Sequence, residues 1–260
     1  MNYEKDKAEA RLNEITSGEC LFPFVMGILN LTPDSFSDGG KFATPAEACA
    51  CGVKFAADGA YIVDVGGEST RPGSAPITAE EEWRRIGPVL KMLKKENVCL
   101  SVDTYRPETA QRALDLGVDM INCVDALRAR EMYRLCCQYK ADLVIPSSAY
   151  EERFESIKGM LYLDPMIGFG TTRSEDRDLL RSLPEMTKRH RVLVGASRKR
   201  IAQHLAGVDS PADTLGADMA IVTWCALSGV SMVRVHDVRE AVCAVNAANS
   251  LRSGFSLVKR

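Results

Sequence analysis

The stretch Met26-Gly-Ile-Leu-Asn-Leu-Thr-Pro-Asp-Ser-Phe-Ser-Asp-Gly-Gly40 is the most informative part of this sequence. It continues a short apolar run, from Phe24 to Leu29, that predicts a buried strand. The eleven residues after this run are mostly polar, and a simple strand connection needs far fewer. We therefore expect the strand to deliver Asn30 and the two aspartates of the loop to a site for a metal-bound, phosphorylated ligand.

Apolar runs of strand length recur along the rest of the chain, with amphipathic segments between them. Strands are predicted at 24–29, 61–65, 99–102, 119–122, 142–146, 161–164, 192–195 and 232–235. Helices are predicted at 45–58, 78–95, 107–116, 127–138, 174–190, 198–206, 211–228 and 238–251. Eight strands separated by helices favour a parallel sheet closed into a single (β/α)8 TIM barrel, which typically needs about 250 residues. Residues 1–260 are taken as one domain with an N-terminal extension over 1–22.

Polar residues fall at or just past the C-terminal end of the predicted strands, the face on which barrel enzymes build their active sites. They are Asn30, Asp64, Asp103, Asn122, Asp164, Ser197 and His236. One such residue is most often an ordinary cap or turn, but seven on one rim indicate a functional site. We therefore expect an active site at the C-terminal ends of the strands.

Composition narrows the class of protein. The chain is 46% hydrophobic and 26% charged, with a formal net charge of -2, which argues for a large core and against general nucleic-acid binding. Its nine cysteines contain no CxxC pair and read as reduced core residues. We see no signal sequence and no membrane span, so a cytoplasmic protein without membrane or nucleic-acid partners is expected.

Two long motifs resemble the signatures of dihydropteroate synthase, a pterin-binding enzyme family. The first is the stretch quoted above, and the second is Asp64-Val-Gly-Gly-Glu-Ser-Thr-Arg-Pro-Gly73. Shorter matches follow in family order: Ser101-Val-Asp-Thr104, Leu163-Asp-Pro165, Gly168-Phe-Gly170, Gly195-Ala-Ser-Arg-Lys199 and Arg234-Val-His-Asp-Val238. The resemblance implies a TIM barrel that joins 6-hydroxymethyl-7,8-dihydropterin diphosphate to p-aminobenzoate and releases diphosphate.

The resemblance also implies roles for particular residues. The pterin would be held by Asp103, Asn122, Asp164, Phe169, Gly195 and Lys199. Diphosphate and p-aminobenzoate would be held by Asn30, Thr70, Arg71, Ser197, Arg234 and His236. Catalysis would rest on Asp103, Lys199, Arg234 and His236, with Mg²⁺ as the cofactor and Asn30 as its protein ligand. The family's dimer makes a homodimer the expected assembly.

The residue types suit these roles. Carboxylate and amide oxygens accept hydrogen bonds from the donor edge of a pterin, and such paired acceptors discriminate strongly between ligands. Lys199 follows a strand and precedes a helix, where a cation reaches a carbonyl or phosphate oxygen. Arg234 and His236 alternate along the last strand and therefore share a face, which suits diphosphate.

Several positions depart from the family pattern. Residues 147–160 leave room for only a short fifth helix, and Val144 to Ser147 replace a Met-His pair. Thr171 stands in place of a Lys, so we expect a weaker diphosphate site unless that Lys acts through loop packing. Cys123 replaces an Asp and Met166 a Gly.

Three alternatives therefore stay open beside the synthase. The first is a paralogue that kept the pocket but lost or changed the reaction. The second is a pterin-binding protein of the methyltetrahydrofolate:corrinoid methyltransferase type, which does not need Ser197-Arg198-Lys199 or the first loop. The third is a non-enzymatic pterin-binding module, which does not need Arg71. The presence of both loop motifs favours the synthase.

Overall fold

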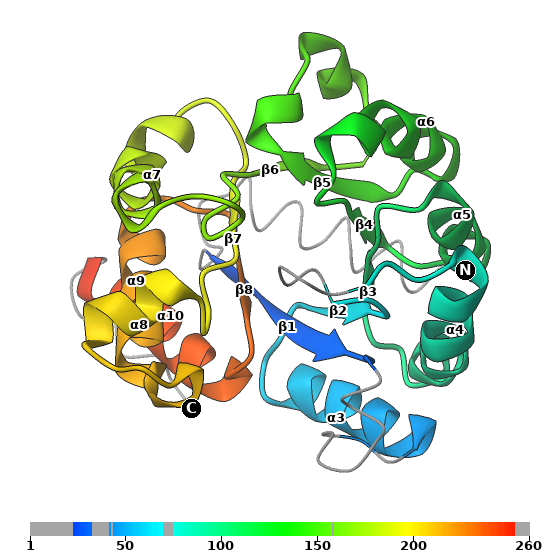
Figure 1. Ribbon diagram of the computed structural model, residues 1–260, viewed down its shortest axis with the longest axis horizontal. Helices are drawn as coiled ribbons and strands as arrows, with labels where there is room; N and C mark the ends of the chain where they lie inside the picture. The colour runs from blue at the N-terminus through cyan, green and yellow to red at the C-terminus, as the bar shows by residue number, and fades with distance from the viewer. Residues whose placement is uncertain (1–22, 33–41, 43, 70–74, 158, 253–260) are drawn as a thin grey trace.

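The computed structural model describes residues 23–32, 42, 44–69, 75–157 and 159–252. Eight parallel strands form one sheet in the order β6-β5-β4-β3-β2-β1-β8-β7, and a bridge between Leu163 and Val192 joins its two ends (Figure 1). The strands are β1 (Phe24–Asn30), β2 (Ile62–Gly66), β3 (Leu100–Asp103), β4 (Met120–Asn122), β5 (Asp142–Pro146), β6 (Leu161–Asp164), β7 (Leu193–Val194) and β8 (Met232–Val235). The predicted TIM barrel is confirmed.

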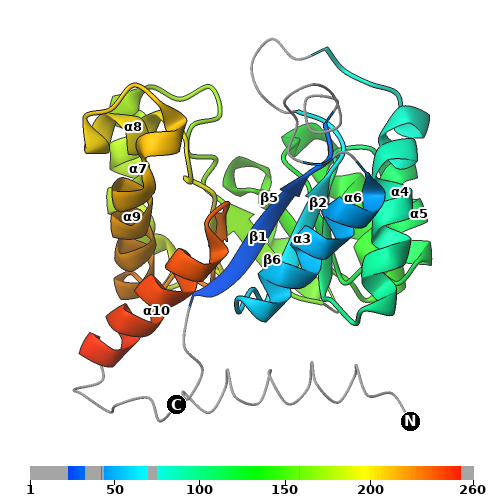
Figure 2. The same cartoon turned by 90° about the horizontal axis from the view of Figure 1, so that it is seen from below.

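Helices surround the barrel and run in the order of the chain around it (Figure 1). They are α3 (Pro45–Ala57), α4 (Ala79–Lys95), α5 (Pro107–Asp115), α6 (Ala129–Tyr139), α7 (Arg173–Met186), α8 (Arg200–Ala206), α9 (Leu215–Leu227) and α10 (Val238–Arg252). Seen from the side, α3 and α10 lie on either side of β1 (Figure 2). Among the described residues, no helix has the length and apolar character needed to cross a membrane.

Two expected helices differ from the structure. The prediction of a short fifth helix is wrong. The described residues between β5 and β6 form only the 3₁₀ turns η2 (Ser147–Ala149) and η3 (Glu152–Ser156). Phe154 of η3 is fully buried and covers the barrel where a helix was expected. The helix expected over 211–228 is divided, because the 3₁₀ turn Pro211–Asp213 precedes α9.

Local sequence explains where several helices begin. Thr44, Thr78 and Thr172 each accept a hydrogen bond from the backbone N–H three residues later, which satisfies a donor that the first helical turn leaves unpaired. Thr172 and Glu175 complete a capping box at the start of α7. Pro107 occupies the first turn of α5, where the backbone needs no amide donor.

The barrel interior is apolar toward the N-terminal ends of the strands and polar toward their C-terminal ends. Its apolar layer contains Met26, Ile62, Met120, Val144, Tyr162, Leu193 and Met232, one from each of seven strands. Side chains two positions apart on a strand point the same way, so the next inward residues are Asp64, Asn122, Asp164 and Arg234. Strand alternation therefore places these polar groups in one layer at the C-terminal end of the barrel.

Candidate active site

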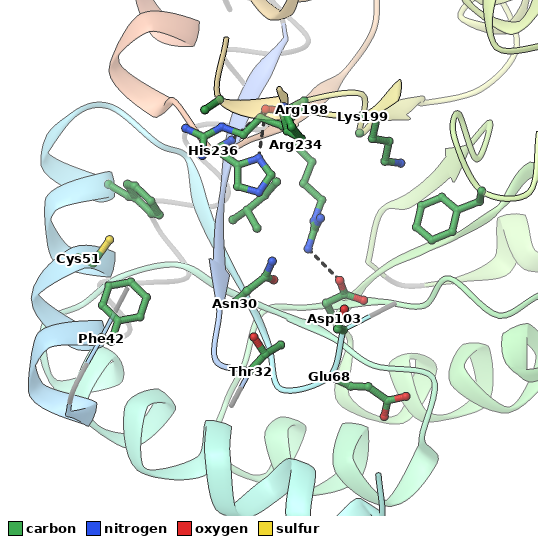
Figure 3. A pocket seen from close by; sticks show the side chains of 18 of the residues that line it. Asn30, Thr32, Phe42, Cys51, Glu68, Asp103, Arg198, Lys199, Arg234 and His236 are labelled. Atoms are coloured by element: carbon green, nitrogen blue, oxygen red, sulfur yellow. Dashed lines mark hydrogen bonds and ion pairs between the residues drawn. The ribbon is translucent and has the colours of Figure 1, made fainter. Parts of the chain in front are cut away.

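A cavity of about 590 Å³ opens at the C-terminal ends of the strands (Figure 3). Eight of the predicted site residues line it: Asn30, Asp103, Phe169, Gly195, Ser197, Lys199, Arg234 and His236. Asn122 and Asp164 are buried in the polar layer of the barrel. Thr70, Arg71 and the two aspartates of the first loop lie outside the described residues, as does the expected extension over 1–22.

Arg234 joins two buried carboxylates at the centre of the site. Its Nε donates to Asp64 Oδ2 at 2.6 Å, and its Nη2 donates to Asp103 Oδ2 at 2.8 Å. Gly195, directly after β7, lies beside this side chain: an added Cβ there would be 3.8 Å from Arg234 Cβ, an ordinary contact distance. Two of the three guanidinium nitrogens therefore bind carboxylates in this structure, although we had expected Arg234 to face diphosphate.

Two buried oxygens in the polar layer have no hydrogen-bond donor among the described residues. Asn122 Nδ2 donates to Asp64 Oδ2 at 3.0 Å, which leaves Asn122 Oδ1 and Asp64 Oδ1 unpaired. A buried acceptor without a donor costs about 1–3 kcal/mol. The arrangement is thus prepared for a ligand that brings hydrogen-bond donors.

Burial and nearby charges set the titration of the acidic groups. Burial raises the pKa of Asp103 to about 7; Arg234 opposes the shift, while Asp64 and Glu82 add to it. Burial also raises the pKa of Asp164, against the effect of Lys199 and of the hydrogen bond from the Met166 N–H at 2.7 Å. Asp103 therefore changes charge near neutral pH.

Lys199 extends across the opposite wall of the cavity. It is the residue that precedes α8, and its Nζ donates to the carbonyl oxygen of Ile167 at 2.6 Å. The same Nζ lies 4.1 Å from the ring centroid of Phe169, at cation–π distance. Burial lowers the pKa of Lys199 to about 8, although Asp164 counteracts part of the shift. Lys199 and Phe169 thus form one wall beside the acidic groups.

Ser197 and His236 meet at the mouth of the cavity. Ser197 Oγ lies 3.2 Å from His236 Nδ1, and 3.5 Å from Asp218 Oδ2, to which it donates. Asp218 also accepts the Arg198 N–H at 3.1 Å, which holds Arg198 in a left-handed conformation with φ of 58°. Asp237 pairs with the Arg198 side chain at 2.6 Å. Two predicted site residues, Ser197 and His236, therefore lie in contact at this end of the cavity.

Asn30 provides the oxygen expected to bind Mg²⁺. It is exposed at the end of β1, where an added Cβ on Gly66 would lie 3.3 Å from Asn30 Oδ1 and 3.5 Å from Asp103 Cβ. Gly66 therefore keeps open the space between Asn30 and Asp103. No group of three or more His, Cys, Asp or Glu suited to a metal occurs among the described residues. This donor set fits Mg²⁺ only as an ion that takes most of its oxygens from a phosphorylated ligand and water.

The departures from the family pattern have clear structural settings. Thr171 donates to Asp176 Oδ1 at 2.5 Å and accepts the Gly168 N–H at 3.0 Å, so its hydroxyl fastens a loop turn. This geometry favours the loop-packing explanation over the loss of a diphosphate charge. Cys123 is buried, and burial raises its pKa to about 12. Met166 adopts φ of 63°, a left-handed conformation that suits glycine better.

Sequence reasoning missed three buried carboxylates that organise the site. Asp64 was noted at a strand end but given no role, although it binds both Arg234 and Asn122. Its period-two spacing from the interior residue Ile62 could have indicated that it points inward. Asp176 and Asp218 lie on helices among ordinary helical residues, so no sequence signal distinguishes them.

The fold and the site define a barrel enzyme. Its pocket, at the C-terminal ends of the strands, is acidic and contains unpaired hydrogen-bond acceptors. Residues 26–160 and 147–236 match the family model for the pterin binding enzyme. The dihydropteroate synthase of Streptococcus pyogenes is 36% identical, over 83% of this chain and 90% of the relative. That of Staphylococcus haemolyticus is also 36% identical, over 82% and 89%.

Solved structures agree with these relatives. Xanthomonas albilineans dihydropteroate synthase with 4-aminobenzoic acid is 35% identical, with a TM-score of 0.80 over 89% of this chain and 93% of that one. The same enzyme in complex with 7,8-dihydropteroate is 32% identical, with a TM-score of 0.77 over 89% and 94%. The chain belongs to the dihydropteroate synthase family of pterin-binding enzymes.

Proposed function

We propose that this protein is a dihydropteroate synthase, a transferase of folate biosynthesis. It condenses 6-hydroxymethyl-7,8-dihydropterin diphosphate with p-aminobenzoate to give 7,8-dihydropteroate and diphosphate. The similarity to known synthases over most of the chain supports this function. The observation in the site that carries it is the pair of unpaired buried acceptors, Asp64 Oδ1 and Asn122 Oδ1, within an acidic layer.

The acidic layer and Lys199 suit the pterin. Asp103, Asp164 and Asn122 offer oxygens to the 2-amino and ring N–H groups along one pterin edge, and Phe169 offers a ring face. A ligand without this donor edge would leave buried acceptors unpaired, so the pocket would reject it. Lys199 is placed to donate to a pterin carbonyl from the other wall.

The leaving-group side of the cavity suits diphosphate and p-aminobenzoate. When the C–O bond breaks, the diphosphate oxygen keeps the electron pair, and Asp103 as a carboxylate favours the cation left on the pterin methylene. Arg234 and His236 donate hydrogen bonds to the departing oxygens, and the positive charge of Lys199 offsets part of their negative charge, so no general acid is required. The aryl amine, held beside Ser197, then forms the C–N bond to the methylene carbon and loses its proton to water.

We propose Mg²⁺ as the cofactor, held by Asn30 together with oxygens of the diphosphate. When bound, this ion neutralises charge on the leaving group. The open space that Gly66 leaves between Asn30 and Asp103 supports the assignment. An Asn30→Ala variant is expected to need a higher Mg²⁺ concentration for half-maximal activity, and an unchanged requirement would contradict the assignment.

A homodimer and a cytoplasmic location are further parts of the proposal. Exposed apolar side chains gather on α8 to α10: Leu205, Leu215, Trp224, Leu227 and Leu251. They suit a self-association surface, and sedimentation of wild type and Leu227→Lys tests this, with a monomeric wild type as the contradicting result. All eight cysteines among the described residues are free thiols, which supports a reducing compartment.

The function is tested by a coupled assay with the pterin diphosphate and p-aminobenzoate, run beside calorimetry with the pterin alone. Turnover with release of diphosphate is expected. Pterin binding without turnover would instead select the paralogue that lost or changed the reaction. Methyl transfer from methyltetrahydrofolate to a corrinoid acceptor would select the methyltransferase type.

A further inference from the structure

A buried carboxylate, that of Asp176, is separated from the Lys199 ammonium by a single backbone peptide group. Asp176, in the first turn of α7, has an exposed fraction of only 2%. Its Oδ1 accepts the backbone N–H of Gly168 at 2.7 Å and the hydroxyl of Thr171 at 2.5 Å. Asp176 lines no part of the cavity described above, so it needs a different explanation.

The same peptide bond that binds Asp176 also binds Lys199. The peptide between Ile167 and Gly168 donates its N–H to Asp176, and its carbonyl oxygen accepts Lys199 Nζ at 2.6 Å. A carboxylate on the N–H and an ammonium on the carbonyl polarise the peptide in the same direction, so each hydrogen bond strengthens the other. Asp176 and Lys199 therefore form an ion pair with a peptide between the two charges.

The packing around Gly168 makes this arrangement specific. Gly168 has φ of 77°, and an added Cβ would lie 2.8 Å from Lys199 Cδ. The Lys199 stem thus lies directly against the residue that Asp176 holds. A shift of this turn would move both the carbonyl that binds Nζ and the Phe169 ring beneath it.

We propose that Asp176 is a positioning residue for Lys199, which acts through the Ile167–Gly168 peptide to hold the ammonium at the pterin end of the cavity. The role at the pterin rests on the proposed function, whereas the link between Asp176 and Lys199 does not. Other charged groups also face Lys199, namely Asp164 on β6, Asp103 on β3 and Arg234 on β8. Asp176 differs from them because it does not line the cavity.

The test removes the charge of Asp176 without changing its shape. Asn in the Asp176→Asn variant still accepts the Gly168 N–H and the Thr171 hydroxyl. Competitive labelling of the substrate-free protein with acetic anhydride, read by mass spectrometry of the Lys199 peptide, measures titration of this one amine. Since Asp176 raises the pKa of Lys199, whose value is about 8, the variant should titrate lower by about one pH unit. The alkaline limb of kcat/KM should move with it.

Asp178→Asn is the matched control, because it makes the same change in the same helix at an exposed carboxylate. Its Lys199 titration should equal that of wild type. An unshifted Asp176→Asn protein, or an equal shift in Asp178→Asn, would overturn the proposal. If Asp176→Asn does not fold, Thr171→Lys serves instead: it places an ammonium on Asp176, and an unchanged Lys199 titration in that variant would also overturn the proposal.

This labelling separates the inference from the proposed function. A wild-type protein without synthase turnover would refute the function, while the labelling experiment on the same protein would still report on Lys199. An active wild type with an unshifted Asp176→Asn variant would refute the inference alone.

Discussion

Replacing Arg234 with Met should destabilise the protein strongly, by an amount that grows with pH. The guanidinium lies between Asp64 and Asp103, with side-chain exposures of 18%, 0% and 12%. Removing one partner from a buried ion pair typically costs about 3–5 kcal/mol, because the remaining charge is buried without compensation. We expect a loss in this range at pH 8, from a total stability that is typically about 5–15 kcal/mol.

The pH dependence follows from the titration of Asp103. Its pKa in the folded protein, about 7, lies above the ordinary carboxyl value, so folding favours protonated Asp103. In the wild type, the stability gained in this way falls as pH rises from the ordinary carboxyl pKa to 7, and it is lost above pH 7. Without Arg234, which opposes the shift, the pKa rises further and the loss continues above pH 7. The difference in unfolding free energy between wild type and variant should therefore be larger at pH 8 than at pH 6.

Urea unfolding of both proteins at pH 6 and pH 8 measures this difference. Arg112→Met is the control, since Arg112 Nη1 lies 2.8 Å from Glu80 Oε2 but both side chains are exposed. The control should lose less than about 1 kcal/mol, without the rise between the two pH values. A loss below about 1 kcal/mol in Arg234→Met at pH 8, or one that does not grow with pH, would refute the reasoning.

Three further predictions concern binding, rate and strain. Asp103→Asn and Asp164→Asn should each abolish pterin binding in calorimetry while circular dichroism stays unchanged, and retained affinity in both would contradict the pocket. Lys199→Ala should lower kcat/KM by about 10–100-fold, the worth of a charge-assisted hydrogen bond, and full activity would place that charge elsewhere. Met166→Gly should raise the free energy of unfolding by about 0.5–1 kcal/mol in urea, because Met166 adopts φ of 63°; a decrease would show that its side chain contributes more than the strain costs.

The sequence predicted the architecture because the signals for it are local. Apolar runs marked all eight strands to within one or two residues, and polar residues at their ends marked the correct face of the barrel. Asn122 and Asp164 lie two positions after interior apolar residues, so strand alternation alone points them inward. The prediction of a short fifth helix was wrong because the sequence of this short segment does not distinguish a helix from 3₁₀ turns. Either conformation can bury Phe154.

Only the tertiary structure decided which partners these residues have. Arg234 is 131 residues from Asp103 and 170 from Asp64, and closure of the barrel brings the three together. The link from Asp176 to Lys199 runs through a backbone peptide, and the orientation of that peptide cannot be inferred from the residue types. The sequence by itself determined the elements and the direction of strand side chains, since these depend on neighbours along the chain. The pairing of charges depends on distances across the barrel, which exist only once the strands have closed.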